Sequence, residues 1–286
     1  MTPSIATKLQ YLVRPEGRLS YTVAGVGPLI VAVPGMGDLR SSYIELAGPL
    51  VDAGFRVALL DLRGHGDSDT TFRTHGDEAT AGDILALIDE LRGRAVVMGN
   101  SMAASAAVIA AADRPDAVAG LVLLSPFLRQ SGGHATLVLS RLLFRALFAR
   151  PWGARMWTNY YAKTLNRGAK GPRLAEHAAE IAASMADPAR LASFRHLAVQ
   201  LDHSVVEPRV AAVVAPSLTV IGSVDPDYKD PAAALAAAGD ALDGETLLVE
   251  NTAHYPHLAR PDIVTHRVLG FVDGLRDGAG WRAPRA

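Results

Sequence analysis

Short apolar runs recur along this chain, and a segment with helical patterning or a turn separates each from the next. Six runs are apolar at nearly every position, namely residues 29–33, 55–62, 95–99, 120–125, 217–222 and 245–250. A strand that is apolar on both faces belongs in a sheet covered on both sides, because each face must be buried. The sequence therefore predicts an α/β fold with a mostly parallel sheet between two layers of helices.

The connecting segments and the N-terminal region complete this prediction. In residues 80–92, Ile84 and Ile88 share one side of a helix, while the charged residues lie off that side. Residues 8–13 and 18–24 are typical of an antiparallel hairpin that leads into the sheet. We therefore expect eight strands, with helices on both faces of the sheet.

The alternation of strands and helices stops between Pro126 and about Val213. This stretch is mostly helical in pattern and is too long for a simple crossover connection. We therefore expect residues 127–213 to form a helical lid inserted after the sixth strand. Residues 1–126 and 214–286 would then make up the core domain.

The first part of the expected lid has an unusual charge. Between residues 127 and 175 there are nine arginine and lysine residues and no acidic residue, although the whole chain has a net charge of −1. We interpret these side chains as a solvated face. The alternative is a surface that recognises an anionic ligand, an acyl carrier or a membrane.

The overall composition excludes several classes of protein. The 286 residues are 49% hydrophobic and 20% charged, without the basic bias of a nucleic-acid-binding protein. There is no cysteine, which excludes disulfides, thiol nucleophiles and cysteine-ligated metal sites. The first residues lack the apolar stretch of a signal peptide, and Arg141 and Arg145 interrupt the most apolar later segment. We expect a cytoplasmic protein with no nucleic-acid partner and no stable membrane anchor.

The run at residues 95–99 leads into the sequence GNSMA, which holds a serine between a predicted strand and an alanine-rich helix. A nucleophile elbow needs this context. The sharp turn exposes the serine hydroxyl, and small residues such as Gly99 and Ala103 let strand and helix pack closely. The helix N-terminus would also favour negative charge that develops near Ser101. The alternative is that Ser101 simply caps the helix.

A nucleophilic serine needs a base and an acid on later strands, and candidates for both are present. Asp225 follows the fifth of the six apolar runs, and His254 follows the sixth. Asp227 and Asp230 are alternatives for the acid because they lie in the same turn. His257 is an alternative for the base, since it lies only three residues after His254.

Early in the chain, the sequence VAVPGMGD puts a glycine-rich turn after the first apolar run. The amide of Met36 in this turn and the amide of Met102 after the serine could together stabilise an oxyanion. The turn does not fit a dinucleotide site, because Arg40 stands where the third glycine is required. We expect no cofactor and no metal, since no carboxylate stands at a useful spacing from the pair His254 and His257.

With these motifs in place, the chain resembles the α/β-hydrolase superfamily over nearly its whole length. The sequence DLRGHGDSD is similar to the family's turn after the fourth strand, and HYPHLARP is similar to its catalytic-histidine segment. The resemblance implies that Ser101 is the nucleophile, His254 the base and Asp225 the acid. It also implies an oxyanion hole made by the backbone amides of Met36 and Met102. It points to an esterase, a peroxidase-like enzyme or a carbon–carbon hydrolase, and it excludes relatives with an aspartate nucleophile.

We therefore expect a serine hydrolase that cleaves a small or medium-sized, mainly apolar carboxylic ester or related acyl compound through an acyl-enzyme on Ser101. Alternatives are a carbon–carbon bond hydrolase or a thioesterase with the same triad, and a non-catalytic ligand receptor or partner-binding protein with the same fold. The expected partner is a small-molecule acyl substrate, and a homodimer is compatible with the sequence. The candidates to line the substrate pocket are mostly aromatic: His65, Phe127, Phe144, Trp157, Tyr160 and His257.

Overall fold

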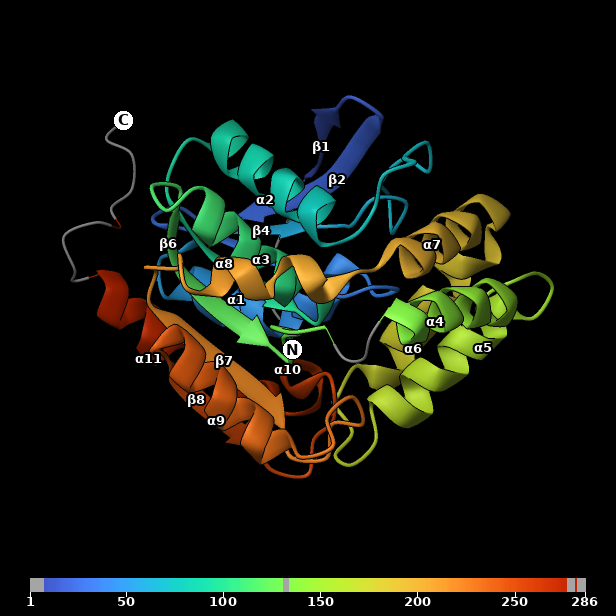
Figure 1. The fold of residues 1–286 in the computed structure, drawn as a ribbon. Coiled ribbons are helices and arrows are strands. Elements are labelled where there is room, and N and C mark those ends of the chain that lie inside the picture. Colours follow the sequence, from blue (N-terminus) through green and yellow to red (C-terminus); the bar gives the residue numbers. More distant parts are fainter. Residues whose placement is uncertain (1–7, 131–133, 277–280, 282–286) are drawn as a thin grey trace.

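The computed structural model describes residues 8–130, 134–276 and 281, and a single sheet forms its centre (Figure 1). The sheet has eight strands in the order β1-β2-β4-β3-β5-β6-β7-β8 among the described residues. Strand β2 runs antiparallel to both of its neighbours, and the other pairs are parallel. The strands are β1 (Leu9–Arg14), β2 (Gly17–Ala24), β3 (Leu29–Val33), β4 (Arg56–Leu60), β5 (Ala95–Asn100), β6 (Val118–Leu124), β7 (Ser217–Gly222) and β8 (Glu245–Val249). The predicted fold class is confirmed.

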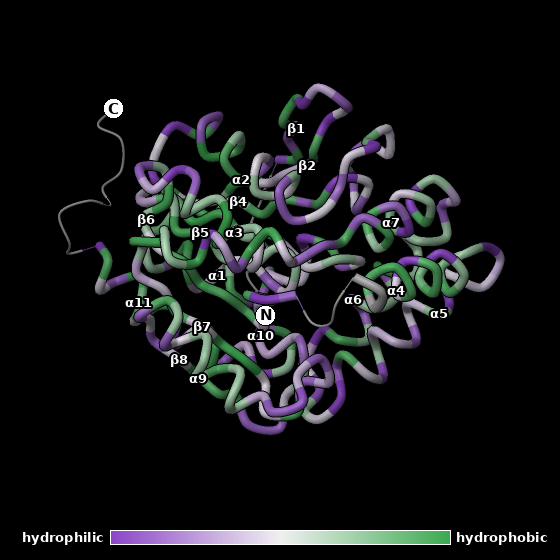
Figure 2. The backbone as a smooth tube through the Cα atoms, viewed as in Figure 1, coloured by the Kyte–Doolittle hydropathy of each residue, from purple (hydrophilic) through white to green (hydrophobic). Residues whose placement is uncertain are grey.

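Helices cover both faces of the sheet because the strands present apolar side chains on both. Val31 and Val97 pack on one face with α2 and α3, whereas Ile30 and Val96 pack on the other with α1 and α11. Figure 2 shows hydrophobic residues concentrated along the strands. The helices of the core are η1 (Arg40–Tyr43), α1 (Ile44–Asp52), α2 (Asp77–Leu91), α3 (Met102–Asp113), α9 (Pro231–Leu242), α10 (Pro256–Ala259) and α11 (Pro261–Arg276).

A helical insertion lies between β6 and β7, where the sequence predicts a lid. Its elements are α4 (His134–Leu147), α5 (Gly153–Tyr160), η2 (Tyr161–Leu165), α6 (Leu174–Ala186), α7 (Pro188–Gln200), η3 (His203–Val205) and α8 (Glu207–Val210). Helices α4 to α7 gather at one end of the molecule, on the right in Figure 1. They enclose an aromatic core that includes Phe148, Trp157 and Phe194. By contrast, η3 and α8 pack on α2 and α3 of the core.

The hydropathy of the helices bears on the expectation that the protein has no stable membrane anchor. Within the described ranges, every helix is too short or too polar to span a bilayer.

Candidate active site

Ser101 lies at the sharp turn between β5 and α3. Its backbone has φ 57° and ψ −124°, a conformation that residues other than glycine rarely adopt. Its N–H donates a hydrogen bond of 2.8 Å to the carbonyl of Leu124, which holds the turn against the end of β6. Ser101 occupies the N-cap position of α3, yet its side chain makes no capping hydrogen bond. The alternative of an ordinary helix cap therefore does not describe this serine.

Two glycines allow the backbone to approach closely at this turn. A Cβ atom on Gly99 would lie 2.5 Å from the carbonyl carbon and oxygen of Ala103, so only glycine fits between β5 and α3. A Cβ atom on Gly35 would lie 3.0 Å from the Cβ atom of Ser101. The loop after β3, which contains Met36, therefore runs directly beside the serine.

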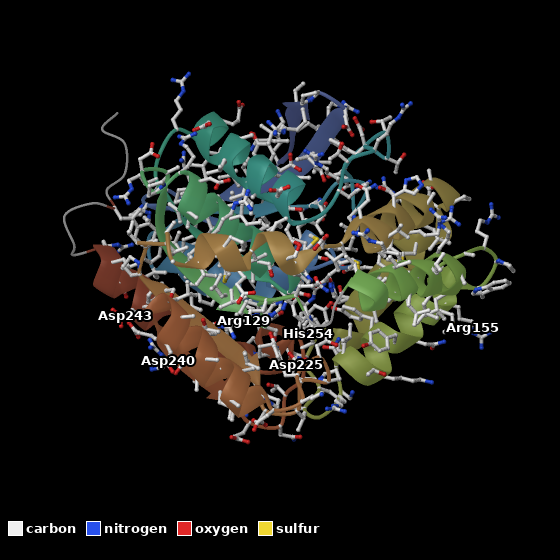
Figure 3. The ribbon with its side chains drawn as sticks, in the orientation of Figure 1. Arg129, Arg155, Asp225, Asp240, Asp243 and His254 are labelled. Atoms are coloured by element: carbon white, nitrogen blue, oxygen red, sulfur yellow. The ribbon has the colours of Figure 1, made fainter. Side chains whose placement is uncertain are left out.

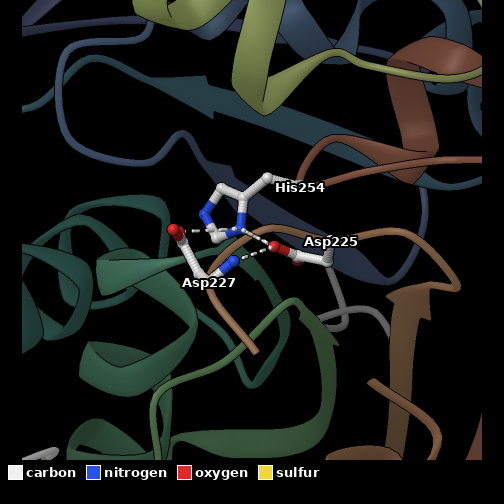
Figure 4. A group of neighbouring side chains, drawn as sticks. All are labelled: Asp225, Asp227 and His254. Atoms are coloured by element: carbon white, nitrogen blue, oxygen red, sulfur yellow. Dashed lines mark hydrogen bonds and ion pairs between the residues drawn. The ribbon is translucent and has the colours of Figure 1, made fainter. Parts of the chain in front are cut away.

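His254 lies in the loop after β8 and pairs with Asp225, which follows β7 (Figure 4). Its Nδ1 is 3.0 Å from Oδ2 and 3.2 Å from Oδ1 of Asp225, and both side chains are buried. Asp227 approaches the same Nδ1, at 3.3 Å, and its own N–H donates to Asp225. Asp230 instead accepts a hydrogen bond from Ala233 N–H and caps α9.

Ser101 and His254 both line a cavity of about 520 Å³. The rest of its lining is mostly apolar and comes from both the core and the insertion, including Met36, Met102, Phe127, Phe144, Phe148, Met156 and Trp157. The amide of Met102 is the first of α3, and the first amides of a helix have no acceptor within it. Met36 and Met102 therefore both border the space in front of the serine.

A larger cavity, of about 860 Å³, lies between η1, β2, β4 and α6. Its lining includes seven charged side chains beside apolar ones, and its arginines are paired. Arg40 binds Asp61 and Asp67, while Arg173 binds Glu176 and Glu180. It contains none of the predicted catalytic residues, so the smaller apolar cavity is the candidate site.

A model of the alpha/beta hydrolase family matches residues 30–267 of the chain. The chain belongs to the α/β-hydrolase family. The 2-hydroxy-6-oxo-6-phenylhexa-2,4-dienoate hydrolase of Comamonas testosteroni is 32% identical over 144 residues, which are 46% of this chain and 49% of that protein. Human monoglyceride lipase is 32% identical over 114 residues, or 38% of each chain. These matches span less than half the length of the curated relatives.

Solved structures share the fold of this α/β-hydrolase over almost its whole length. A thermophilic esterase from Thermogutta terrifontis superposes with a TM-score of 0.77 and covers 94% of this chain and 99% of its own. The two sequences are 20% identical, so this likeness concerns the fold alone.

The two carboxylates of this α/β-hydrolase that face His254 differ in their electrostatics. Burial alone would lower the pKa of His254, but the negative charges of Asp225 and Asp227 outweigh it and raise that pKa to about 9. Burial opposes ionisation of Asp225, yet the nearby His254 holds its pKa below the usual value. For Asp227, burial prevails and the pKa is raised. Asp225 is thus the better counter-ion for the imidazole.

The same three residues are the group of described side chains most suited to hold a metal ion. One ligand atom from each of Asp225, Asp227 and His254 lies within 4.8 Å of the other two. However, Nδ1 of His254 is already hydrogen-bonded to Asp225, and one nitrogen cannot serve both partners at once. The structure therefore favours the hydrogen-bonded arrangement.

Four of the six predicted pocket residues line the candidate cavity, namely Phe127, Phe144, Trp157 and Tyr160. The prediction is wrong for the two histidines. His65 lies behind the loop after β3, where its Nε2 accepts a hydrogen bond of 3.1 Å from Gly37 N–H.

The other histidine, His257, lies on the short helix α10 and is not among the residues that line the candidate cavity. Its ring stacks on Tyr43 at 4.9 Å, and its side chain is fully buried. Burial lowers the pKa of His257 to about 3, so it is a neutral core residue. It is therefore not an alternative base at this site.

Sequence reasoning missed Asn100, which connects two parts of the site. Its Nδ2 donates to the carbonyls of Leu124 and His254, at 3.2 and 3.1 Å. The side chain therefore ties the serine turn to the histidine loop. The position of Asn100 between Gly99 and Ser101 was the only sequence signal for a role at the site. Its two partner carbonyls lie 24 and 154 residues away, so the sequence alone did not reveal these contacts.

Proposed function

We propose that this chain is a serine hydrolase that cleaves small or medium-sized, mainly apolar carboxylic esters through an acyl-enzyme on Ser101. One observation carries the proposal. Ser101 sits on a strained turn, its side chain does not cap the helix, and it lines the cavity that also holds His254. An exposed nucleophile beside a histidine that is oriented by a buried carboxylate is the arrangement that acyl transfer requires.

The proposed reaction uses the chain's own groups and water. The Oγ of Ser101 attacks the carbonyl carbon, and its proton passes to Nε2 of His254 while Asp225 holds Nδ1–H. The amides of Met36 and Met102 stabilise the oxyanion. The imidazolium then protonates the leaving alcohol, and a water molecule activated by His254 releases the acid and restores Ser101.

The shape and polarity of the cavity support an apolar substrate. Its volume of about 520 Å³ suits a small or medium-sized molecule, and aromatic and methionine side chains make up half of the residues that line it. The names of the curated relatives, a lipase and a hydrolase, agree with hydrolytic chemistry. The similarity to the dienoate hydrolase favours carbon–carbon bond hydrolysis on the same triad as a second candidate.

A panel of p-nitrophenyl esters of increasing acyl length tests the proposal. We expect turnover by the wild type, and we expect Ser101→Ala to fold normally while its rate falls at least about a thousandfold. Ser184→Ala, on α6 and outside the cavity, is the matched control and should keep the wild-type rate.

A fluorophosphonate probe provides an independent readout, because it should label Ser101 and no other serine. Labelling at another residue, or retention of more than about a tenth of the rate by Ser101→Ala, would refute the assignment. If the wild type neither turns over an ester nor takes up the probe, a non-catalytic ligand receptor becomes the better interpretation.

A further inference from the structure

Large apolar side chains are exposed on the outer side of the insertion. Leu139 is 66% exposed, Leu142 58% and Leu143 52%, and Trp152, which follows α4, is 53% exposed. We call the following set the outer apolar face: Val138, Leu139, Leu142, Leu143, Trp152 and Met156.

Helix geometry explains why the members of this face lie together. Residues three and four apart share one side of a helix, so Val138, Leu139, Leu142 and Leu143 form one stripe along α4. The indole N–H of Trp152 donates to the carbonyl of Ala146, which places the ring at the end of that stripe. The outer apolar face is therefore continuous from α4 to the start of α5.

The opposite side of α4 already supplies the contacts that the fold needs. Phe144 and Leu147 line the candidate cavity, and Phe144 stacks on Phe148 at 5.6 Å. A helix that packs by one side normally turns polar side chains outward, and contiguous exposed apolar surface marks an interaction site. The part of the outer apolar face that lies on α4 is therefore not needed for the packing of the insertion.

The charges around the face indicate what it binds. Arg145, Arg150 and Arg155 are exposed in and beside α4 and α5, and no acidic residue occurs between residues 127 and 175. Figure 3 shows Arg155 at the outer edge of the insertion, far from His254. Three basic residues of this segment are already in ion pairs: Arg129 with Glu207, Arg141 with Asp202, and Arg173 with Glu176 and Glu180. The other basic residues, which include Arg145, Arg150 and Arg155, would attract an anionic surface.

A second copy of this chain does not suit the face. A symmetric dimer would place the same patch of each copy against the other. The arginines of one copy would then face those of its partner, with no carboxylate from this segment to neutralise them. Like charges at an interface oppose association.

We propose that the outer apolar face docks reversibly on an anionic lipid surface. The leucines and Trp152 enter the boundary between headgroups and acyl chains, and the neighbouring arginines contact lipid phosphates. The indole suits this position because its ring offers a large apolar surface and its N–H is already satisfied by the carbonyl of Ala146.

The same docking would bring the candidate cavity to the membrane. Met156 is 45% exposed within the outer apolar face and also lines the cavity, so the cavity wall is continuous with the docking surface. Delivery of a lipid-dissolved ester to Ser101 would follow. This last consequence rests on the proposed function, whereas the docking itself does not.

Vesicle sedimentation tests the docking with the full chain. We expect the protein to sediment with vesicles of phosphatidylcholine mixed with phosphatidylglycerol and not with vesicles of phosphatidylcholine alone. Added salt should weaken the binding, because the Debye length falls from about 10 Å at 0.1 M to about 3 Å at 1 M. Equal binding to the two kinds of vesicle would contradict an anionic target.

Paired variants test which surface is responsible. We expect Leu139→Glu combined with Leu142→Glu to reduce the vesicle affinity about tenfold or more, without changing the rate on a soluble short-chain ester. The matched controls are Val26→Glu and Val214→Glu, at surface positions outside the insertion helices that are 81% and 77% exposed. These variants should bind vesicles as the wild type does. Equal losses in all these variants would refute the assignment.

Two further variants separate this proposal from folding defects and from the hydrolase assignment. Arg145→Glu combined with Arg150→Glu should also weaken binding, by a change of charge that leaves the leucines in place. Ser101→Ala should bind vesicles normally, so a failure of the hydrolase proposal leaves the docking result intact. Absence of vesicle binding by the wild type, with a dimer that the leucine variant dissociates, would show a dimer interface and overturn the proposal.

Discussion

The indole Nε1 of Trp157 donates a hydrogen bond of 2.9 Å to the carbonyl oxygen of Gly37. Trp157 belongs to α5 of the insertion, whereas Gly37 follows Met36 in the loop beside Ser101. The contact is close, since a Cβ atom on Gly37 would lie 2.4 Å from the indole ring. The insertion therefore helps to position the loop that would hold the oxyanion.

The first prediction follows from this contact. Trp157→Phe keeps an aromatic ring but loses the donor, so the loop should shift and kcat should fall by up to about a hundredfold. Ester hydrolysis, measured as separate kcat and KM, provides the test. Trp152→Phe, which loses a donor to Ala146 on the same insertion, is the control and should leave kcat unchanged. A rise in KM with an unaltered kcat would show that Trp157 only lines the cavity.

The second prediction concerns the two carboxylates near His254. A general base must be neutral, and the pKa of about 9 places the rise of kcat/KM of the wild type in the alkaline range. Asp227→Asn removes one charge that raises this pKa, so the rise should move to lower pH with a similar plateau. Asp225→Asn should lower the plateau by about 10⁴, because the imidazole loses its orienting partner. Full pH–rate profiles distinguish the two, and an exchange of their effects would make Asp227 the acid.

The third prediction concerns a buried histidine that joins the insertion to the core. His177 in α6 lies 2.5 Å by its Nε2 from Asp38 and 3.3 Å by its Nδ1 from Glu180. Burial alone would lower the pKa of His177, but Asp38 and Glu180 raise it to about 9. A raised pKa in the folded state means that the stabilisation is complete below the ordinary value of 6.5 and is lost as the pH rises through about 9.

His177→Gln should therefore lower the free energy of unfolding by about 3–5 kcal/mol at mildly acidic pH, because it leaves buried Asp38 without its charged partner. The difference from the wild type should shrink above the raised pKa, where the wild-type imidazole is also neutral. Denaturant unfolding at pH values below and above that pKa measures this difference in the free energy of unfolding. His266→Gln, at an exposed position of α11, should have little effect at either pH. A difference that did not change with pH would indicate lost packing alone.

The fourth prediction concerns the close approach of β5 and α3 at the serine turn. Gly99→Ala puts a methyl group 2.5 Å from backbone atoms of Ala103, which cannot move without displacing the helix. We expect a loss of about 1–3 kcal/mol in stability and a large loss of hydrolysis. Gly270→Ala in α11 meets nothing within 4 Å and should be neutral or slightly stabilising. Wild-type melting temperature and activity in Gly99→Ala would contradict this packing.

The sheet and the order of the site residues could be read from the amino-acid pattern. The runs at 29–33 and 217–222 have the same bounds as β3 and β7, because a strand buried on both faces is apolar at most positions. Asp225 and His254 meet because parallel strands end at one edge of the sheet, so loops after different strands converge there. Local periodicity and strand direction suffice for these features.

The contacts between the insertion and the core needed the three-dimensional structure. Trp157 and Gly37 are 120 residues apart, and no local period relates them. The approach of the second carboxylate, Asp227, to His254 also needed the structure, because the distance between them depends on how two loops pack. His65 and His257 were misplaced for this reason, since a histidine in a turn or short helix reaches the cavity or the core according to the neighbours that surround it. Strand and helix periods follow from neighbours in the chain, whereas the direction of a loop side chain follows from contacts that form only when distant segments pack.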